Sequence, residues 1–96
     1  MKQEIRLLSI EEVRHLKCGQ WVWVEVADSE AYPGGAFYYC ELADDAETIE
    51  DPYTYTVVYF HSLGGCERFD TAQYGWRIWT GKPTKKLSKK TKWELI

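Results

Sequence analysis

Two histidines and two cysteines are the first side chains to test for chemistry, because imidazole and thiolate groups are common zinc ligands. His15 precedes Cys18 by three residues, and His61 precedes Cys66 by five. Structural zinc sites usually contain a closely spaced pair of cysteines, and no two cysteines of this chain are close in sequence. We therefore interpret the cysteines as buried and the histidines as solvated, and we predict neither a metal site nor a cofactor.

The acidic run at residues 44–51 is a second candidate, because carboxylate oxygens bind calcium. The run lacks the alternating Asp or Asn positions and the central glycine of an EF-hand loop. A solvated acidic loop is the favoured interpretation, and a weak, nonspecific cation site is the alternative.

Catalytic motifs are missing from the sequence. There is no Gly-x-Ser-x-Gly elbow, no phosphate-binding glycine loop and no His-Glu-x-x-His pair. Ser62 directly follows His61, but adjacent residues of a strand or turn point apart and so do not pair as nucleophile and base. We predict that the protein is not an enzyme.

The carboxylates are segregated along the chain. From Cys18 to Glu67 there are ten acidic residues and no lysine or arginine, whereas the rest of the chain holds all 12 basic residues and five acidic ones. A surface of one sign attracts oppositely charged partners over about 8–10 Å. We predict a surface that binds a basic partner, and ordinary solubility is the alternative explanation. The predicted partner-binding residues are Glu25, Asp28, Glu30, Tyr32, Glu41, Asp44, Asp45, Glu47, Glu50 and Asp51.

Aromatic residues are unusually frequent, with five Trp, seven Tyr and three Phe in 96 residues. Each large ring buries roughly 150–250 Å², so the core of so small a domain cannot hold all of them. Exposed rings commonly anchor protein interfaces. The surface candidates are Trp21, Trp23, Tyr53 and Tyr55.

The N-terminal part predicts one short helix. Ser9-Ile10-Glu11-Glu12 is a capping box, in which the side chains of the first and last residues bond each other's backbone amides. Apolar residues follow at helical spacing, and Gly19 supplies a stop. We predict a helix over residues 10–17, after an edge strand over residues 4–8.

Most of the remaining sequence predicts β-strands. In residues 21–26, valines alternate with Trp21, Trp23 and Glu25, which predicts a strand with the valines on one face. Turn residues at 32–35 and 62–65 and the acidic loop at 44–52 separate the later strands. Those strands are predicted over residues 36–42, 53–61, 66–69 and 76–80.

These elements predict a mainly β fold in one domain spanning residues 1–96. The expected architecture is a small SH3-like barrel, or a curled antiparallel sheet of about five strands, with one short N-terminal helix. Residues 81–96 form a predicted lysine-rich tail. The first residues are mixed and charged, and no apolar run approaches the ~20 residues of a membrane span. Together with an odd number of scattered cysteines, this predicts a cytoplasmic protein.

Both ends of the chain carry a recognisable pattern. Residues 76–84 read WRIWTGKPT, preceded by Tyr74-Gly75 and followed by a Lys-Trp-Glu at 92–94, and the opening contains SIEEV and GQWVWVE. This pattern resembles short proteins encoded by phages and other mobile elements of Gram-positive bacteria. In that pattern two residues usually separate the Tyr-Gly pair from the first Trp, whereas here Trp76 follows directly. Residues 28–67 show no such likeness.

The resemblance implies a biological context, that of a mobile element in a host cell. It implies no catalytic residue and no cofactor. Small acidic phage proteins often bind host machinery, so we predict a non-enzymatic protein that binds a host protein with a basic surface. The concrete version is an anti-CRISPR-like inhibitor of a nucleic-acid-binding defence nuclease, acting in the host cytoplasm. One alternative is an SH3-like accessory module that grips a peptide or subunit. The other is a nucleic-acid binder using the lysine-rich tail, which an isoelectric point of about 5.3 disfavours.

Overall fold

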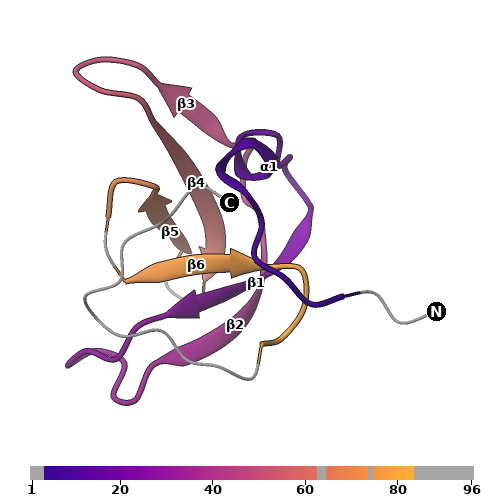
Figure 1. The fold of residues 1–96 in the computed structure, drawn as a ribbon, viewed down its shortest axis with the longest axis vertical. Helices are drawn as coiled ribbons and strands as arrows, with labels where there is room; N and C mark the ends of the chain where they lie inside the picture. The colour runs from indigo at the N-terminus through magenta and orange to yellow at the C-terminus, as the bar shows by residue number, and fades with distance from the viewer. Residues whose placement is uncertain (1–3, 63–64, 74, 84–96) are drawn as a thin grey trace.

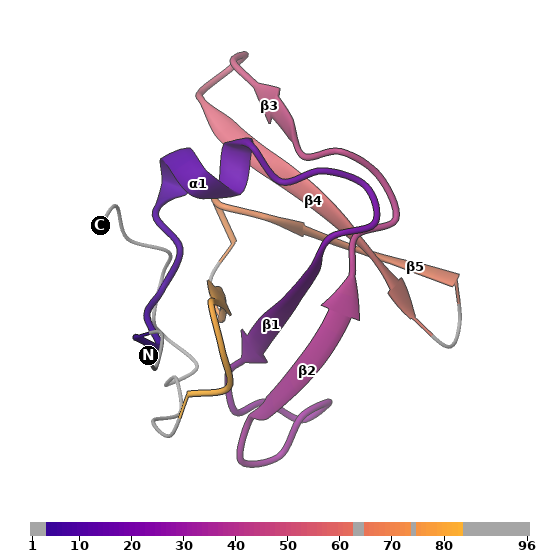
Figure 2. The same cartoon turned by 90° about the vertical axis from the view of Figure 1, so that its right-hand side faces the viewer.

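The structure is a computed structural model that describes residues 4–62, 65–73 and 75–83. In this part of the chain all strand pairs are antiparallel, and they form two three-stranded sheets with the strand orders β2-β1-β6 and β3-β4-β5 (Figures 1 and 2). The elements are α1 (Ile10–Arg14), β1 (Trp21–Val26), β2 (Ala36–Glu41), β3 (Glu47–Ile49), β4 (Tyr55–Ser62), β5 (Gly65–Asp70) and β6 (Trp76–Trp79). The predicted mainly β fold with one short helix is confirmed, but the two sheets do not close into a barrel.

The capping box at the start of α1 is confirmed. The Glu12 amide donates to Ser9 Oγ at 3.2 Å, and the Ser9 amide donates to the Glu12 carboxylate at 3.0 Å. The helix ends at Arg14, earlier than predicted, because the next amides reach back only three residues. His15 N–H donates to the Glu12 carbonyl at 3.1 Å, and Leu16 N–H donates to the Val13 carbonyl at 3.2 Å. Such tightening is common in a last turn.

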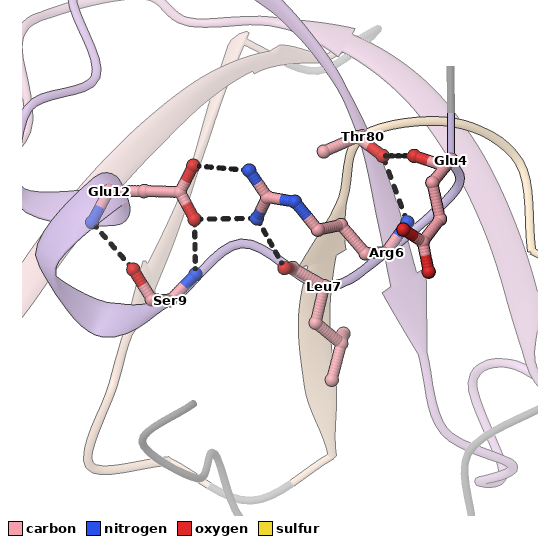
Figure 3. A network of polar contacts seen from close by, with 6 residues as sticks. All are labelled: Glu4, Arg6, Leu7, Ser9, Glu12 and Thr80. Atoms are coloured by element: carbon pink, nitrogen blue, oxygen red, sulfur yellow. Dashed lines mark hydrogen bonds and ion pairs between the residues drawn. The ribbon is translucent and has the colours of Figure 1, made fainter. Parts of the chain in front are cut away.

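The segment before α1 is tied to both the helix and β6 (Figure 3). The Arg6 guanidinium donates two hydrogen bonds to the Glu12 carboxylate, at 2.7 and 2.9 Å. The Arg6 amide donates to Thr80 Oγ1 at 3.0 Å, and the Thr80 hydroxyl donates to the Glu4 carbonyl at 3.2 Å. The predicted edge strand over residues 4–8 is reduced to a single bridge between Leu7 and Trp79.

The core lies between the two sheets. The predicted alternation in β1 is confirmed, because Val22, Val24 and Val26 face the core, where they pack near Val58 and Phe60 of β4. Burial of each large apolar side chain contributes roughly 1.5–3 kcal/mol. The other buried members of this core are Leu8, Ile10, Val13, Leu16, Leu42, Trp76 and Ile78.

The predicted acidic loop over residues 44–52 contains a strand that was not expected. β3 pairs with β4 from Glu47 opposite Val57 to Ile49 opposite Tyr55. β3 was missed because it is short and mostly polar, so its own residues give no strand pattern. It is a strand because it pairs with β4, which follows it in the chain. The limits of the other strands lie within two residues of those predicted. No helix in the described ranges is both long and apolar enough to cross a membrane. The predicted tail lies outside the described residues from residue 84 onward.

Candidate functional site

The predicted acidic surface is divided among separate parts of the molecule. Asp28 and Glu30 lie in the loop between β1 and β2, whereas Glu50 and Asp51 lie in the turn between β3 and β4. Figure 2 shows that loop at the bottom and that turn at the top of the molecule. The exposed members are Asp28, Glu30, Asp44, Asp45, Glu47, Glu50 and Asp51, while Tyr32 and Glu41 are partly buried. These side chains therefore do not form one continuous face.

Glu25 was predicted to bind a partner, and this prediction is wrong because its side chain has no exposed surface. Trp79 Nε1 donates to Glu25 Oε1 at 2.9 Å, and Arg77 Nη2 donates to the same oxygen at 3.3 Å. Both partners come from β6, which pairs with β1. A buried carboxylate needs such partners, since desolvation of an unpaired charge is very costly. Glu25 therefore holds β1 and β6 together and cannot meet a ligand.

Three other acidic residues order the loops in which they lie. The Gly34 amide donates to Asp28 Oδ1 at 2.6 Å and closes the loop between β1 and β2. The Cys18 amide donates to Asp45 Oδ1 at 2.9 Å, while the Asp45 amide donates to Asp44 Oδ1 at 2.8 Å. These contacts give the three carboxylates a structural role whether or not a partner also touches them.

A groove of about 660 Å³ lies between β1 and β2 on one side and the β4–β5 hairpin on the other. The described residues that line it include two carboxylates, Glu41 and Glu67, and one imidazole, His61. None of these described lining residues is lysine or arginine. The lining is otherwise mainly aromatic and aliphatic. It comprises Trp21, Val24, Val26, Tyr32, Tyr38, Tyr39, Cys40, Glu41, Phe60, His61, Ser62, Cys66, Glu67 and Phe69.

The groove lies beside a place where the backbones of the two sheets are joined. A bridge between Leu42 and Phe60 joins the end of β2 to β4, and β2 and β5 are the outermost strands of their respective sheets. Tyr38 lies on the inner face of β2, opposite Val24, yet it remains 45% exposed. The inner faces of the sheets therefore stay partly uncovered beyond the bridge.

Aromatic pairs line the groove. Tyr32 meets Tyr38 edge to face, with ring centroids 5.9 Å apart. Tyr39 packs on Trp21 at 5.1 Å, and Phe60 packs on Phe69 at 5.9 Å. Ring faces carry partial negative charge, so such walls attract cations as well as apolar groups.

The electrostatics of the groove are negative. Burial, and then the charge of Glu67, raise the pKa of both the Tyr32 hydroxyl and the Cys40 thiol, so both groups are neutral at pH 7. Glu41 Oε1 lies 3.9 Å from His61 Nε2, a contact that becomes an ion pair when the imidazole is protonated. At neutral pH the two carboxylates favour a cationic ligand group.

The four predicted surface aromatics occupy two places. Trp21 and Trp23 lie on the outer face of the β2-β1-β6 sheet, where each ring packs on Tyr39. Trp21 is exposed and also borders the groove, whereas Trp23 is partly buried. The rings of Tyr53 and Tyr55 pack in a tilted arrangement at the start of β4, with centroids 5.2 Å apart, and neither lines the groove. Tyr53 is exposed, and Tyr55 is partly buried.

The four candidate zinc ligands do not come together. His15 Nδ1 contacts the Glu11 carbonyl at 2.8 Å, and Cys18 Sγ contacts the Ala43 carbonyl at 3.5 Å. His61 and Cys66 are opposite each other on β4 and β5, at the groove. Among the described residues no three His, Cys, Asp or Glu side chains are placed to hold a metal ion.

The predicted burial of the cysteines is wrong for Cys18 and Cys66, which are exposed, while Cys40 is half-buried. Both exposed cysteines lie where the chain turns or a strand begins, rather than on a core-facing position.

Sequence reasoning missed much of the groove, including Tyr38, Phe60, Glu67 and Phe69. The alternation in residues 36–41 places Tyr38 and Cys40 on one face of a strand, and Glu67 closes the lysine-free segment. Neither signal indicates that the two sheets diverge at this place.

Comparison of the chain with protein-family models, with curated proteins and with solved structures finds no match. The groove is therefore interpreted from its own chemistry, and the likeness to phage-encoded proteins stays a prediction.

Proposed function

We propose that the protein is a non-enzymatic binding module whose groove holds a lysine- or arginine-bearing segment of a partner protein. The observation that carries this proposal is the lining of the groove, which combines aromatic side chains with Glu41 and Glu67 and, among its described residues, contains no lysine or arginine. An aromatic wall beside a carboxylate is a recurrent way to bind an ammonium or guanidinium group.

Each part of a basic side chain has a matching surface in the groove. A cation over a ring contributes roughly 0.5–2 kcal/mol, depending on how far it is desolvated. The aliphatic stem of a lysine or arginine can pack on the apolar floor, where Val24 and Val26 lie. Tyr32 and Tyr38 stand at one wall of the groove and provide the ring surfaces.

The finer version of the proposal makes the partner a nucleic-acid-binding defence nuclease of a host cell. Its support is the likeness to mobile-element proteins together with the acidic groove. Such a nuclease uses lysine and arginine side chains to contact the phosphates of its nucleic acid. In the proposed complex, Glu41 and Glu67 would hold these side chains instead. The accessory-module alternative uses the same groove and differs only in the partner. The nucleic-acid alternative depends on lysines that lie mostly outside the described residues.

A peptide titration tests the groove directly. Two heptapeptides of alternating residues, one lysine with valine and one glutamate with valine, are added to the ¹⁵N-labelled protein and followed by NMR. We expect the lysine peptide to shift the amides of Tyr38, Cys40 and Glu67, with an affinity that falls as salt rises, and the glutamate peptide to leave them unchanged.

Variants locate the interaction. Tyr38→Ala, and the double change Glu41→Lys with Glu67→Lys, should each weaken lysine-peptide binding about tenfold or more. Tyr53→Ala is the matched control, because Tyr53 is equally aromatic and exposed but does not line the groove. Equal binding of the two peptides, or unchanged binding by the charge-reversed protein, would contradict the proposed function.

A further inference from the structure

Four consecutive residues of β2, from Tyr38 to Glu41, line the groove. Side chains alternate between the two faces of a strand, so a cavity on one face would meet only every second residue. Tyr38 and Cys40 pair with inward-facing valines of β1, whereas Tyr39 and Glu41 pair with its outward-facing tryptophans. The groove therefore runs along the edge of β2 and reaches its backbone.

The outer edge of β2 has no strand partner in the described part of the chain. β2 is the outermost strand of its sheet, and none of the described strands pairs with its other side. Proteins usually protect such an edge with lysine, proline or a bulge. β2 contains neither residue, and its register with β1 is unbroken from Ala36 opposite Val26 to Glu41 opposite Trp21. An unprotected edge with exposed tyrosines is suited to pairing with another strand.

The opposite wall of the groove is formed by the paired strands of the β4–β5 hairpin. Phe60, His61 and Ser62 at the end of β4 line it, as do Cys66 and Glu67 at the start of β5. Figure 2 shows the β4–β5 hairpin extending past the end of β2 on the same side of the molecule. A chain laid along β2 would therefore have aromatic and acidic groups on both sides.

We propose that the groove accepts an extended segment of the partner as an additional strand along β2. The inference rests on the proposed function and names its binding mode. Side chains of the added strand alternate, so those that face inward meet Tyr38, Phe60 and Glu67, whereas those that face outward meet Tyr39 and Glu41. A sequence that alternates apolar residues with lysine or arginine can therefore place its basic side chains beside one of these two carboxylates, over about the six residues of β2.

Backbone methylation tests this mode without changing a side chain. In an added strand the amides of alternate residues point toward β2, and the amides between them point away. The alternating lysine–valine heptapeptide is compared by calorimetry with two derivatives, one N-methylated at its valines and one at its lysines. We expect one derivative to lose at least about tenfold in affinity, since several backbone hydrogen bonds are lost together, and the other to bind within about threefold of the parent.

The outcomes separate the two proposals. If the parent binds and the two derivatives bind equally, whether affinity is retained or lost, strand addition is wrong while the proposed function stands. If the parent does not bind, both proposals fail. Sedimentation of the protein alone tests a second copy as the occupant of the edge. A dimer that the parent peptide does not dissociate would assign β2 to self-association and overturn the inference.

Hydrogen exchange of the protein gives a second test of strand addition along β2. Hydrogen exchange of the β2 amides is followed with and without the parent peptide. We expect protection at alternate β2 amides that are unprotected in the free protein, because only every second amide faces the added strand. Unchanged exchange along β2 at saturating peptide would also overturn the inference.

Discussion

Glu25 and Glu41 lie on the same face of one sheet but differ in burial and in their contacts. Glu25 belongs to the central strand β1, where Arg77 and Trp79 of β6 bind its carboxylate and its side chain is fully covered. Glu41 belongs to the outer strand β2, where its side chain is 38% exposed and lies 3.9 Å from His61 at the groove. The centre of the sheet uses a carboxylate to hold strands together, whereas the edge leaves one partly exposed at the groove.

This difference shows that position in the strand order decides what an acidic residue does. A central strand has neighbours on both sides, so a charge there must be paired within the protein. An edge strand lacks one neighbour, and its outward side chains keep contact with water. A local run of acidic residues therefore does not define a binding surface until the strand order is known.

The largest expected effect comes from removing the buried carboxylate. Glu25→Ala leaves Arg77 and the Trp79 N–H without their acceptor inside the sheet. Because loss of one partner of a buried ion pair typically costs 3–5 kcal/mol and Arg77 is partly exposed, we expect a loss of about 3 kcal/mol in the free energy of unfolding. Urea denaturation measures it.

Glu41→Ala is the matched control for this comparison, since Glu41 faces the same side of the same sheet. We expect a change of less than about 0.5 kcal/mol, as for other partly exposed residues without strong partners. If the two substitutions destabilised the protein equally, the distinction between centre and edge would be wrong.

A smaller effect is expected from Trp79→Phe, which keeps an aromatic ring but removes the indole N–H that donates to Glu25. Hydrogen bonds to charged groups contribute about 1.5–3 kcal/mol, so we expect a loss of about 1.5 kcal/mol by the same measurement. Trp21→Phe is the control, because Trp21 is exposed and should change stability by less than about 0.5 kcal/mol. Similar losses of unfolding free energy in the two variants would show that the Trp79 N–H does not stabilise Glu25.

The smallest effect concerns the exposed pair Arg6–Glu12, which contrasts with the buried pair Arg77–Glu25. Hydrogen bonds from the Arg6 guanidinium and then from the Ser9 amide lower the pKa of Glu12 from 4.5 to about 2. A lowered folded-state pKa stabilises the fold above pH 4.5, and this contribution is lost as the pH falls toward 2.

The measurement compares wild type with Arg6→Met in urea at pH 7, 4 and 2. We expect Arg6→Met to be only slightly less stable at pH 7, because both side chains are exposed and water screens their charges. The difference should shrink at pH 4 and vanish near pH 2. A difference that stays constant with pH would assign the role of Arg6 to packing rather than to its ion pair.

Local signals in the sequence were sufficient for much of the fold. Ser9 and Glu12 start the helix because both capping partners are three residues apart. The alternation in residues 21–26 identifies β1 and its core-facing valines, since the period of a strand is two residues.

The remaining features depend on distant partners that no local pattern reports. β3 is defined by its pairing with β4. The burial of the Glu25 carboxylate depends on its contact with Arg77, which lies 52 residues later in the chain. The groove depends on the bridge between Leu42 and Phe60 that joins the two sheets, and on which strands are outermost. The sequence identified Tyr32 and Glu41 of its lining as partner-binding candidates, but it grouped them with acidic residues at the far ends of the molecule.

Three of the chain's five tryptophans, Trp21, Trp23 and Trp79, lie on the outer face of one sheet, whereas Trp76 is buried in the core. Among these four tryptophans, most of those that contribute to the intrinsic emission therefore lie on a sheet surface rather than in the core. Trp21 alone among these three borders the groove. Ligand-dependent quenching that disappears in Trp21→Phe would make this residue a built-in optical probe of occupancy, with no need for an attached dye.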